Sequence, residues 1–220
     1  MPSESVENYL KAIYQIENRS GERVKTKDVA AELNLSMPSV TSMMRSLSNQ
    51  GMLDYVPYQG VRLTEQGHRA ALKVIRRHRL LEVFLNETLG MTWSEVHEEA
   101  ELLEHALSDK LTDRIDAFLG HPVADPHGDP IPTRDGVMPA QRGQALVGLA
   151  EDTHAVVARV LSQETAFLRY LASKGLQPGA QFVITEVAPF HGPITLQVAG
   201  RDAPVSLSVE ASRLLLVEPV

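Results

Sequence analysis

Apolar residues recur at helical spacing through the first fifty residues of the chain. In VENYLKAIYQIENR, Val6, Leu10 and Ile13 fall on one face of a helix of 3.6 residues per turn. TKDVAAELNL predicts a short second helix. SMPSVTSMMRSLSNQGML predicts a third, with Ser36 as its N-cap and Gly51 at its end. LDYVPYQGVRLTEQG then alternates around a Gln-Gly turn, which predicts a small β-hairpin.

Two longer helical patterns follow the hairpin. EQGHRAALKVIRRHRLLEVFLNETLG predicts an amphipathic helix over residues 65–89 that ends at Gly90. TWSEVHEEAELLEHALSDKLTDRIDAFLG predicts one further helix, with Thr92 as its cap and Glu95 completing a capping box.

The last part of the chain changes from helical spacing to alternation. HPVADPHGDPIPTRDGVMP contains five of the thirteen prolines, so we expect an irregular linker that folds over its neighbours. After a helix in SQETAFLRYLASKG, the segments AQFVITEVA, PITLQVA, PVSLSVEA and RLLLVE alternate between Gly and Pro turns. They predict the strands of a small SH3-like β-barrel.

These elements predict a mainly α-helical chain with a small β part, in three domains. The expected domains are a winged helix-turn-helix at 1–75, a helical domain with the Pro-rich linker at 76–140, and the SH3-like barrel at 141–220.

The N-terminal pattern has the element order of a DNA-reading winged helix. A short helix, a tight turn, a second helix and a hairpin that would be the wing follow one another. We expect the following residues to face the major groove: Ser36, Pro38, Ser39, Thr41, Ser42 and Arg45. Lys25, Lys27 and Arg62 are candidates for phosphate contact. The alternative is a three-helix bundle with a Ser-rich turn.

Composition changes this picture through the distribution of charge. The net charge of −7 argues against nucleic acid, but residues 1–79 contain 12 Lys and Arg against 8 Asp and Glu, whereas residues 80–120 contain 2 against 10. Cys is absent, which excludes disulfides, thiolate zinc sites and cysteine nucleophiles. The N-terminus contains no signal-peptide pattern and no segment is long and apolar enough to span a membrane, so we expect a cytoplasmic protein without a membrane partner.

The acidic segment contains the candidate chemistry. HEEAELLEH has no Lys or Arg, and on a single helix its potential ligands fall within roughly a 100° arc. These are His97, Glu101, Glu104 and His105. The preceding helix has His78 and Glu82 at i and i+4. Imidazole and carboxylate ligands without sulfur suit Mn, Fe, Co or Zn.

These residues have two other interpretations. A solvated acidic face is the plain alternative to a metal site. A zincin protease needs a second His where the chain has Glu101, so that interpretation fails. Isolated histidines are more often surface or core residues than ligands, and we assign the following to those roles: His68, His121, His127, His154 and His191.

SMPSVTSMMRSLSNQGML, RRHRLLE, VHEEAELLEH and GDPIP together resemble the DtxR/MntR family of metal-dependent transcriptional repressors, and the resemblance covers essentially the whole chain. It implies a cytoplasmic homodimer whose bound metal fixes the DNA-reading heads on a palindromic operator. It also implies repression of metal uptake genes, and a C-terminal domain of the FeoA-like, SH3-like kind.

The resemblance also implies a ligand set. Glu101, Glu104 and His105 would form the metal-responsive site, with His78, Glu82 and His97 in a companion site. In manganese-type members the residue at His78 instead joins those at Glu101 and Glu104 in a binuclear cluster. Asn8 stands near the place of a further ligand, which is Met in iron-type and Asp in manganese-type members.

The chain departs from the family pattern at three further positions. Lys11 stands where manganese-type members have Glu, and Arg159 and Ser162 fall near the acid and the amide expected from the third domain. Iron-type members tend to have Cys at the position of Glu101, so the resemblance, with only oxygen and nitrogen donors here, implies Mn(II) as the cofactor. Fe(II) is the alternative, and Zn, Co or Cd are able to substitute.

The leading hypothesis is therefore a DNA-binding repressor and not an enzyme, with double-stranded operator DNA, divalent metal ions and a second copy of the chain as partners. A metal-dependent hydrolase is the second hypothesis, but no nucleophile or phosphate loop supports it. The third is a metal-buffering or protein-interaction module, against which the basic first 79 residues argue.

Overall fold

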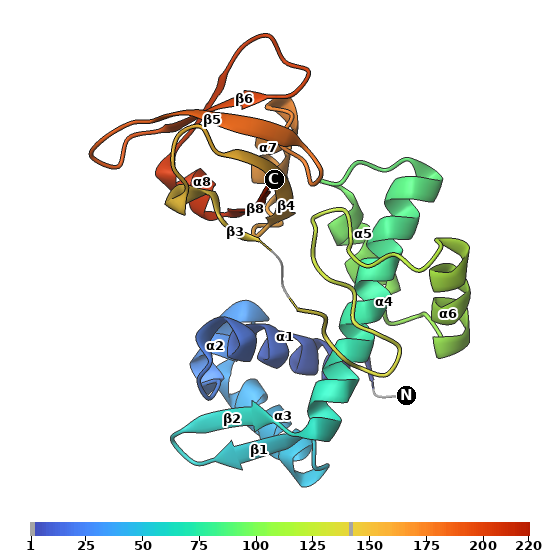
Figure 1. Cartoon of the computed structure of the whole chain (residues 1–220). Helices are drawn as coiled ribbons and strands as arrows, with labels where there is room; N and C mark the ends of the chain where they lie inside the picture. Colours follow the sequence, from blue (N-terminus) through green and yellow to red (C-terminus); the bar gives the residue numbers. More distant parts are fainter. Residues whose placement is uncertain (1–2, 141–142) are drawn as a thin grey trace. The chain divides into compact units, whose positions relative to one another are not determined.

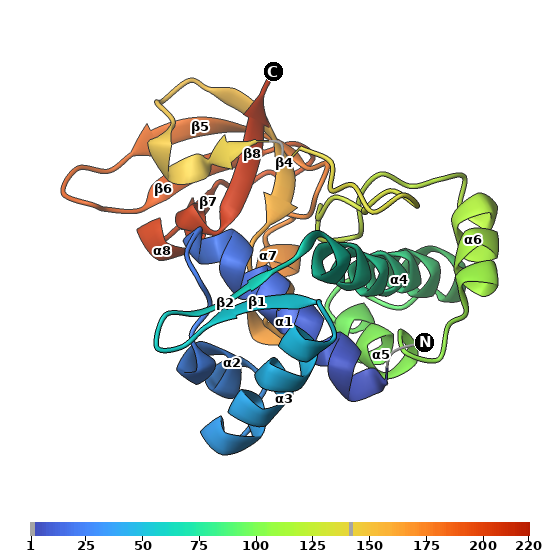
Figure 2. The same ribbon diagram turned by 90° about the horizontal axis from the view of Figure 1, so that it is seen from below.

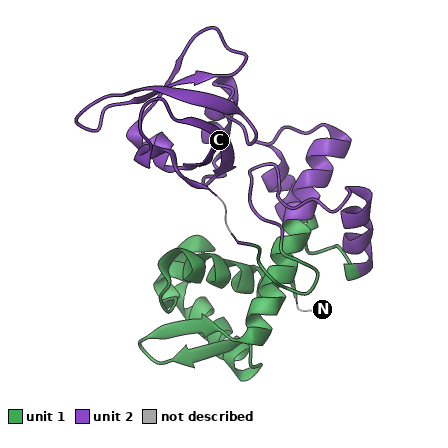
Figure 3. Cartoon of the chain, viewed as in Figure 1, with its two compact units in different colours: residues 1–78, 102–109, 132–139 green, residues 79–101, 110–131, 140–220 purple. Residues whose placement is uncertain are grey.

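The computed structural model describes residues 3–140 and 143–220, and the chain divides into two compact units (Figures 1 and 3). The first unit comprises residues 1–78, 102–109 and 132–139, and the second comprises residues 79–101, 110–131 and 140–220. The three-domain division at 1–75, 76–140 and 141–220 stays a prediction.

Three helices open the first unit, as the apolar spacing predicts. They are α1 (Glu4–Ser20), α2 (Thr26–Glu32) and α3 (Met37–Asn49). The Ser36 hydroxyl accepts a hydrogen bond from the Ser39 N–H at 3.3 Å, so the predicted N-cap of α3 is confirmed. Gly51 follows α3 with φ 74°, the left-handed conformation that ends a helix.

The predicted hairpin forms next to α3 from β1 (Leu53–Val56) and β2 (Gly60–Leu63) (Figure 2). Its turn is not the expected Gln-Gly pair, because Gly60 already pairs with Val56 and the loop comprises residues 57–59. Gly60 is needed for a different reason. A Cβ there would lie 2.4 Å from the Val24 carbonyl oxygen, where the chain before α2 bridges to β2.

The core of the first unit is apolar and comes from all of these elements. Leu10 and Ile13 of α1 are fully buried with Val40, Met44 and Leu47 of α3. Each such side chain contributes roughly 1.5–3 kcal/mol by burial. The predicted DNA-reading surface of α3 is therefore positioned by the opposite, buried face of the same helix.

The long helix α4 (Glu65–Leu89) runs through the boundary between the units, which falls between His78 and Arg79. Its predicted bounds are confirmed, since Gly90 takes φ 71° and its N–H donates to the Asn86 carbonyl oxygen at 3.2 Å.

The single helix predicted from Thr92 onward is wrong. The structure has two helices, α5 (Val96–Leu103) and α6 (Asp109–Phe118). The break is stabilised by Arg77 of α4, whose guanidinium donates to the carbonyl oxygens of Glu104 at 3.3 Å and Leu107 at 3.4 Å. Both carbonyls belong to the turn between α5 and α6, so one side chain of α4 is hydrogen-bonded to two points of that turn. The expected contact between Glu95 and Thr92 does form, in the turn before α5: the Glu95 carboxylate accepts from the Thr92 N–H at 3.1 Å.

A six-stranded antiparallel sheet forms the C-terminal part of the second unit, in the order β3-β8-β4-β5-β6-β7. The strands are β3 (Gln144–Ala145), β4 (His154–Val160), β5 (Gln181–Val187), β6 (Ile194–Val198), β7 (Val205–Leu207) and β8 (Leu215–Pro219). The 3-10 helix η1 (Leu146–Gly148) and helices α7 (Thr165–Ser173) and α8 (Val209–Arg213) complete it.

The sequence-based strand predictions miss part of this sheet. β4 and the short β3 were not expected, and the segment PVSLSVEA divides into β7 and α8 instead of forming one strand. The Ser208 hydroxyl accepts from the Ala211 N–H at 3.2 Å and begins α8. The α7 prediction is confirmed.

The Pro-rich segment is irregular, as expected, and its residues 121–131 pack closely within the second unit. The His127 carbonyl oxygen accepts from the Val160 N–H of β4 at 2.9 Å, and a Cβ at Gly128 would lie 2.1 Å from the Ala158 carbonyl oxygen. Ile131 packs with Leu80 of α4. This segment therefore has a fixed place against α4 and β4.

Among the described residues, no helix is long and apolar enough to cross a membrane.

A buried ion pair joins α1 to α4 in the first unit. Arg77 Nη2 lies 2.7 Å from Glu7 Oε1, and both side chains are almost fully buried. Removing one partner of such a pair leaves a buried charge uncompensated, which costs about 3–5 kcal/mol.

We therefore expect Arg77→Met to lower the free energy of unfolding by about 3–5 kcal/mol in urea titrations with EDTA present. Arg69→Met is the matched control, because Arg69 pairs with Glu65 at i,i+4 on the exposed side of α4. Its loss should change stability by less than about 0.5 kcal/mol. A loss below about 1 kcal/mol for Arg77→Met would contradict the assigned role.

Candidate functional site

Six ionisable side chains gather in the first unit, and we name them the first cluster. They are Glu7, Lys11, Arg77, His78, Glu104 and His105. Glu104 is fully buried at its centre. Its Oε2 lies 2.6 Å from His78 Nδ1, and its Oε1 lies 3.3 Å from His105 Nε2. Three of the predicted ligands are thus brought together.

The way in which they meet differs from the sequence-based argument. Glu104 and His105 do not continue a helical arc from His97 and Glu101, because α5 ends at Leu103. The premise of a single convergent helix face is wrong. The break after α5 instead directs Glu104 and His105 toward α1 and the first half of α4.

Glu7 and Lys11 of α1 are members that the sequence argument did not assign to the site. Glu7 Oε2 lies 2.7 Å from His105 Nδ1. Lys11 Nζ donates to Glu104 at 2.8 and 3.0 Å. Their signal in the sequence is an acid and a base at i and i+4 on a face of α1 that is otherwise apolar. Asn8 lies between them and is half-buried, and its ligand role stays a prediction.

The electrostatics of this cluster favour a charged Glu104. Burial acts to raise its pKa, but the hydrogen bond from His78 and the Lys11 ammonium outweigh burial and hold the pKa below the ordinary value. Glu104 is therefore an anion that is already compensated by neighbouring groups.

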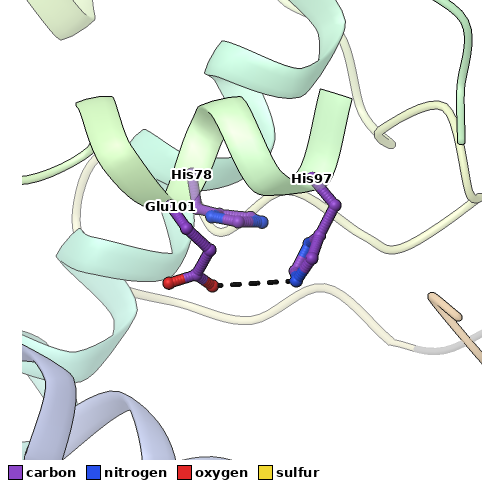
Figure 4. A group of neighbouring side chains, drawn as sticks. All are labelled: His78, His97 and Glu101. Atoms are coloured by element: carbon purple, nitrogen blue, oxygen red, sulfur yellow. Dashed lines mark ion pairs between the residues drawn. The ribbon is translucent and has the colours of Figure 1, made fainter. Parts of the chain in front are cut away.

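A second cluster lies within the second unit and includes Glu82, His97, Glu101, Asp125 and His127. His97 Nδ1 lies 3.1 Å from Glu82 Oε1, and its Nε2 lies 3.8 Å from Glu101 Oε1. Figure 4 draws the His97–Glu101 ion pair on α5 and also labels His78, which belongs to the first unit. Three further predicted ligands are thus adjacent.

Asp125 and His127 of the Pro-rich segment were missed, since His127 was assigned to a surface or core position. His127 is fully buried, and ligand atoms of Glu82, Asp125 and His127 lie within 4.8 Å of one another. The spacing of the two residues around Pro126 gives no periodic signal. Only the packing of this segment on β4 and α4 brings them to Glu82.

The orientation of His127 suits a metal ligand. Its Nε2 lies 2.7 Å from the Trp93 carbonyl oxygen, an acceptor that places the proton on Nε2. Its Nδ1 then faces Glu82 and Asp125, each 3.8 Å away, and makes no hydrogen bond to any described residue. A buried lone pair directed between two carboxylates fits a divalent cation.

The charges around this group also favour a cation. Arg79 lies near the carboxylates of Asp125 and Asp129, and Arg159 pairs with Asp129. The third buried carboxylate, that of Glu82, lies near His127. Burial, followed by the charges of Glu82 and Asp129, raises the pKa of Asp125 well above its ordinary value, although Arg79 opposes the shift. The neighbouring acids thus add to the effect of burial, as expected where several carboxylates share a buried place. Arg159, near the expected place of an acidic ligand, pairs with Asp129.

The predicted DNA-reading residues lie on one surface of α3. Pro38, Thr41, Ser42 and Arg45 line a shallow depression along it. The Ser36 and Ser39 hydroxyls lie 2.8 Å apart, and the Thr41 hydroxyl donates to the Met37 carbonyl oxygen at 2.9 Å. Arg45 is exposed and is the cation of this surface.

The candidate phosphate contacts flank α3. Lys25 and Lys27 are exposed at the start of α2. Arg62 of β2 is half-exposed, but its guanidinium donates to the Gly21 carbonyl oxygen at 3.1 Å and lies 3.7 Å from Glu17. Its role as a phosphate contact therefore competes with a contact within the protein.

Family models match along most of the chain. Residues 1–61 match the iron-dependent repressor N-terminal DNA-binding domain, residues 64–133 the iron-dependent repressor metal-binding and dimerisation domain, and residues 145–219 the FeoA domain. The predicted mainly helical fold with an SH3-like C-terminal domain is thereby confirmed.

Relatives match over nearly the full length. The chain is 31% identical to the iron-dependent repressor IdeR of Mycobacterium tuberculosis over 99% of its residues and 98% of the relative. A manganese-dependent transcriptional repressor in complex with manganese is 39% identical, with a TM-score of 0.86 over 98% of this chain and all of the other. ScaR with bound Cd²⁺ is 32% identical, with a TM-score of 0.79 over 100% of both. The chain belongs to the DtxR/MntR family of metal-dependent, DNA-binding transcriptional repressors.

Proposed function

We propose that Mn(II) is the physiological corepressor and that the bound protein represses metal uptake genes. The observation that carries the choice of metal is the donor chemistry. The candidate ligands are carboxylates and imidazoles without sulfur, which suit Mn(II). The manganese-dependent repressor noted above is 39% identical, whereas the iron-dependent relative is 31% identical. Fe(II) is the alternative that the experiment below separates.

We propose two groups of ligands. Glu82, His97, Asp125 and His127 would hold one ion in the second unit, with Glu101 as a further candidate beside His97. In the first unit, His78, Glu104 and His105 would belong to a metal-responsive site, with Asn8 as a further candidate. A divalent cation bound in either group would supply positive charge to carboxylates and imidazoles that come from separate segments of the chain. His127 is supported by its buried Nδ1, and Glu104 by its contacts with His78 and His105.

The proposed coupling to DNA uses the contacts of α1. Glu7 and Lys11 on α1 contact His105 and Glu104, so any rearrangement of these ligands is transmitted to the helix on which α3 packs through the shared core. One arrangement of the predicted DNA-reading domain, residues 1–75, becomes favoured because it completes the set of metal ligands. Such coupling between two sites is typically about 1–3 kcal/mol.

We further propose that the protein acts in the cytoplasm as a homodimer on a palindromic operator. Large apolar side chains are exposed between residues 89 and 123: Leu89, Leu102, Leu103, Leu111, Phe118 and Val123. They lie in the segment that matches the dimerisation domain. Exposed large apolar side chains are typical of residues that pack against a second copy of a chain.

Fluorescence anisotropy with the protein's own upstream DNA tests the function. We expect tight binding with Mn(II), weaker binding with Fe(II) under anaerobic conditions and little binding in EDTA, because the metal favours the DNA-binding arrangement. Binding unaffected by EDTA would contradict metal dependence. Stronger binding with Fe(II) than with Mn(II) would assign iron as the corepressor.

The ligand role of Glu101 can be tested with Glu101→Gln, which removes the charge and keeps the shape. The Mn(II) concentration that gives half-maximal operator binding should rise at least about tenfold, while the melting temperature in EDTA stays near that of the wild type, since Glu101 is partly exposed. Glu99→Gln, an exposed residue of the same helix, is the control. An unchanged Mn(II) response in Glu101→Gln would exclude Glu101 as a ligand.

Arg45→Ala tests the recognition surface. Loss of this exposed cation of α3 should weaken operator binding by about 1–3 kcal/mol with the metal response retained. Arg69→Ala, which removes an exposed cation on α4, should bind like the wild type. The measurement is anisotropy at several salt concentrations, and equal affinity of Arg45→Ala and the wild type would place the DNA elsewhere.

A further inference from the structure

One cation of the chain lies inside the proposed metal-responsive site. Lys11 Nζ lies 2.8 and 3.0 Å from the two carboxylate oxygens of Glu104, and 3.2 Å from His78 Nδ1. The side chains are 8% and 0% exposed for Lys11 and Glu104. The ammonium thus contacts the same atoms that would bind a metal ion.

The charges of the first cluster are balanced without a metal. Glu7 and Glu104 are matched by Lys11 and Arg77 among buried side chains. At the second cluster, by contrast, the buried carboxylates of Glu82, Asp125 and the adjacent Asp129 outnumber the two guanidinium groups nearby, those of Arg79 and Arg159. A divalent cation at Glu104 would lie close to the Lys11 ammonium. Like charges that close together in a buried place repel strongly, so the two cations exclude each other at this carboxylate.

Of the two buried cations in the first cluster, Lys11 is the one that a metal ion can displace from Glu104. The Arg77 guanidinium is held by the Glu7 carboxylate and by the carbonyl oxygens of Glu104 and Leu107. The Lys11 ammonium contacts two candidate ligands, and a lysine carries its charge on a flexible stem of four methylenes.

We propose that Lys11 is a built-in cation that competes with the metal for Glu104 and His78. Without metal its ammonium neutralises Glu104 and ties α1 to the residues after α5. When metal binds, the ammonium leaves this carboxylate, and the metal ion then links α1 to the residues after α5 in its place. The inference rests on the proposed function only in taking Glu104 and His78 as ligands.

The test compares wild type, Lys11→Met, Lys11→Arg and Lys110→Met as full chains without DNA. Calorimetric titration with Mn(II) measures metal affinity, and thermal melting in EDTA measures the stability of the metal-free protein. Met keeps the length of the Lys stem and removes the charge, and Arg keeps the charge. Lys110 of α6 is an exposed lysine that serves as the matched control.

We expect Lys11→Met to bind Mn(II) at least about tenfold more tightly at one site, because no cation must be displaced. In EDTA its melting temperature should fall by about 5 °C or more, since Glu104 loses its buried partner. Lys11→Arg should bind Mn(II) no more tightly than wild type, and Lys110→Met should match wild type in both measurements. A purely structural lysine would lower the melting temperature without raising the affinity for metal.

Equal or weaker Mn(II) binding by Lys11→Met would overturn the proposal. If that variant does not fold, amine acetylation of the wild type followed by mass spectrometry decides instead. Lys11 should be protected in EDTA and several-fold more reactive with saturating Mn(II), with Lys110 unchanged, and equal protection in both conditions would overturn the proposal.

The proposed function fails separately, if the wild type does not bind its operator in Mn(II). In that case a melting temperature of Lys11→Met equal to wild type in EDTA would also refute the built-in cation.

Discussion

The structure depends on compensation of charges that are buried away from water. An ionised carboxylate in a protein interior is costly unless another group neutralises it. The first cluster meets this requirement with Lys11 and Arg77 against Glu7 and Glu104. At the second cluster the buried carboxylates of Glu82, Asp125 and the adjacent Asp129 outnumber the guanidinium groups of Arg79 and Arg159. Burial, followed by the charges of Glu82 and Asp129, raises the pKa of Asp125. A place where buried negative charge exceeds positive charge is a place for a cation.

Backbone geometry and charge compensation are linked through Arg77. Its guanidinium pairs with Glu7 and also donates hydrogen bonds to the carbonyl oxygens of Glu104 and Leu107, which follow α5. One side chain thus stabilises the helix break that directs Glu104 toward α1. The proposed metal-responsive residues and α1, which shares an apolar core with α3, are therefore joined by one set of contacts. This set is the route along which the proposed coupling would act.

The C-terminal domain contributes to the second cluster without supplying an obvious ligand. Arg159 of β4 pairs with Asp129, and the backbone of β4 holds the segment that carries His127. The Trp93 carbonyl oxygen selects the His127 tautomer, while the Trp93 ring belongs to the core of the sheet domain. The SH3-like domain is thus connected to the candidate metal ligands by packing and hydrogen bonds.

The sequence by itself determined the three N-terminal helices and the bounds of α4, because these features follow from local apolar spacing. It also indicated six ligand candidates from His78 to His105, because their residue types are those that bind metal ions. Local spacing could not reveal the break after α5, since the group that stabilises it comes from α4. Nor could it assign Lys11, Asp125 or His127 to the clusters. Only the tertiary structure decided those positions, because burial brings together residues far apart in the chain and obliges their charges to balance.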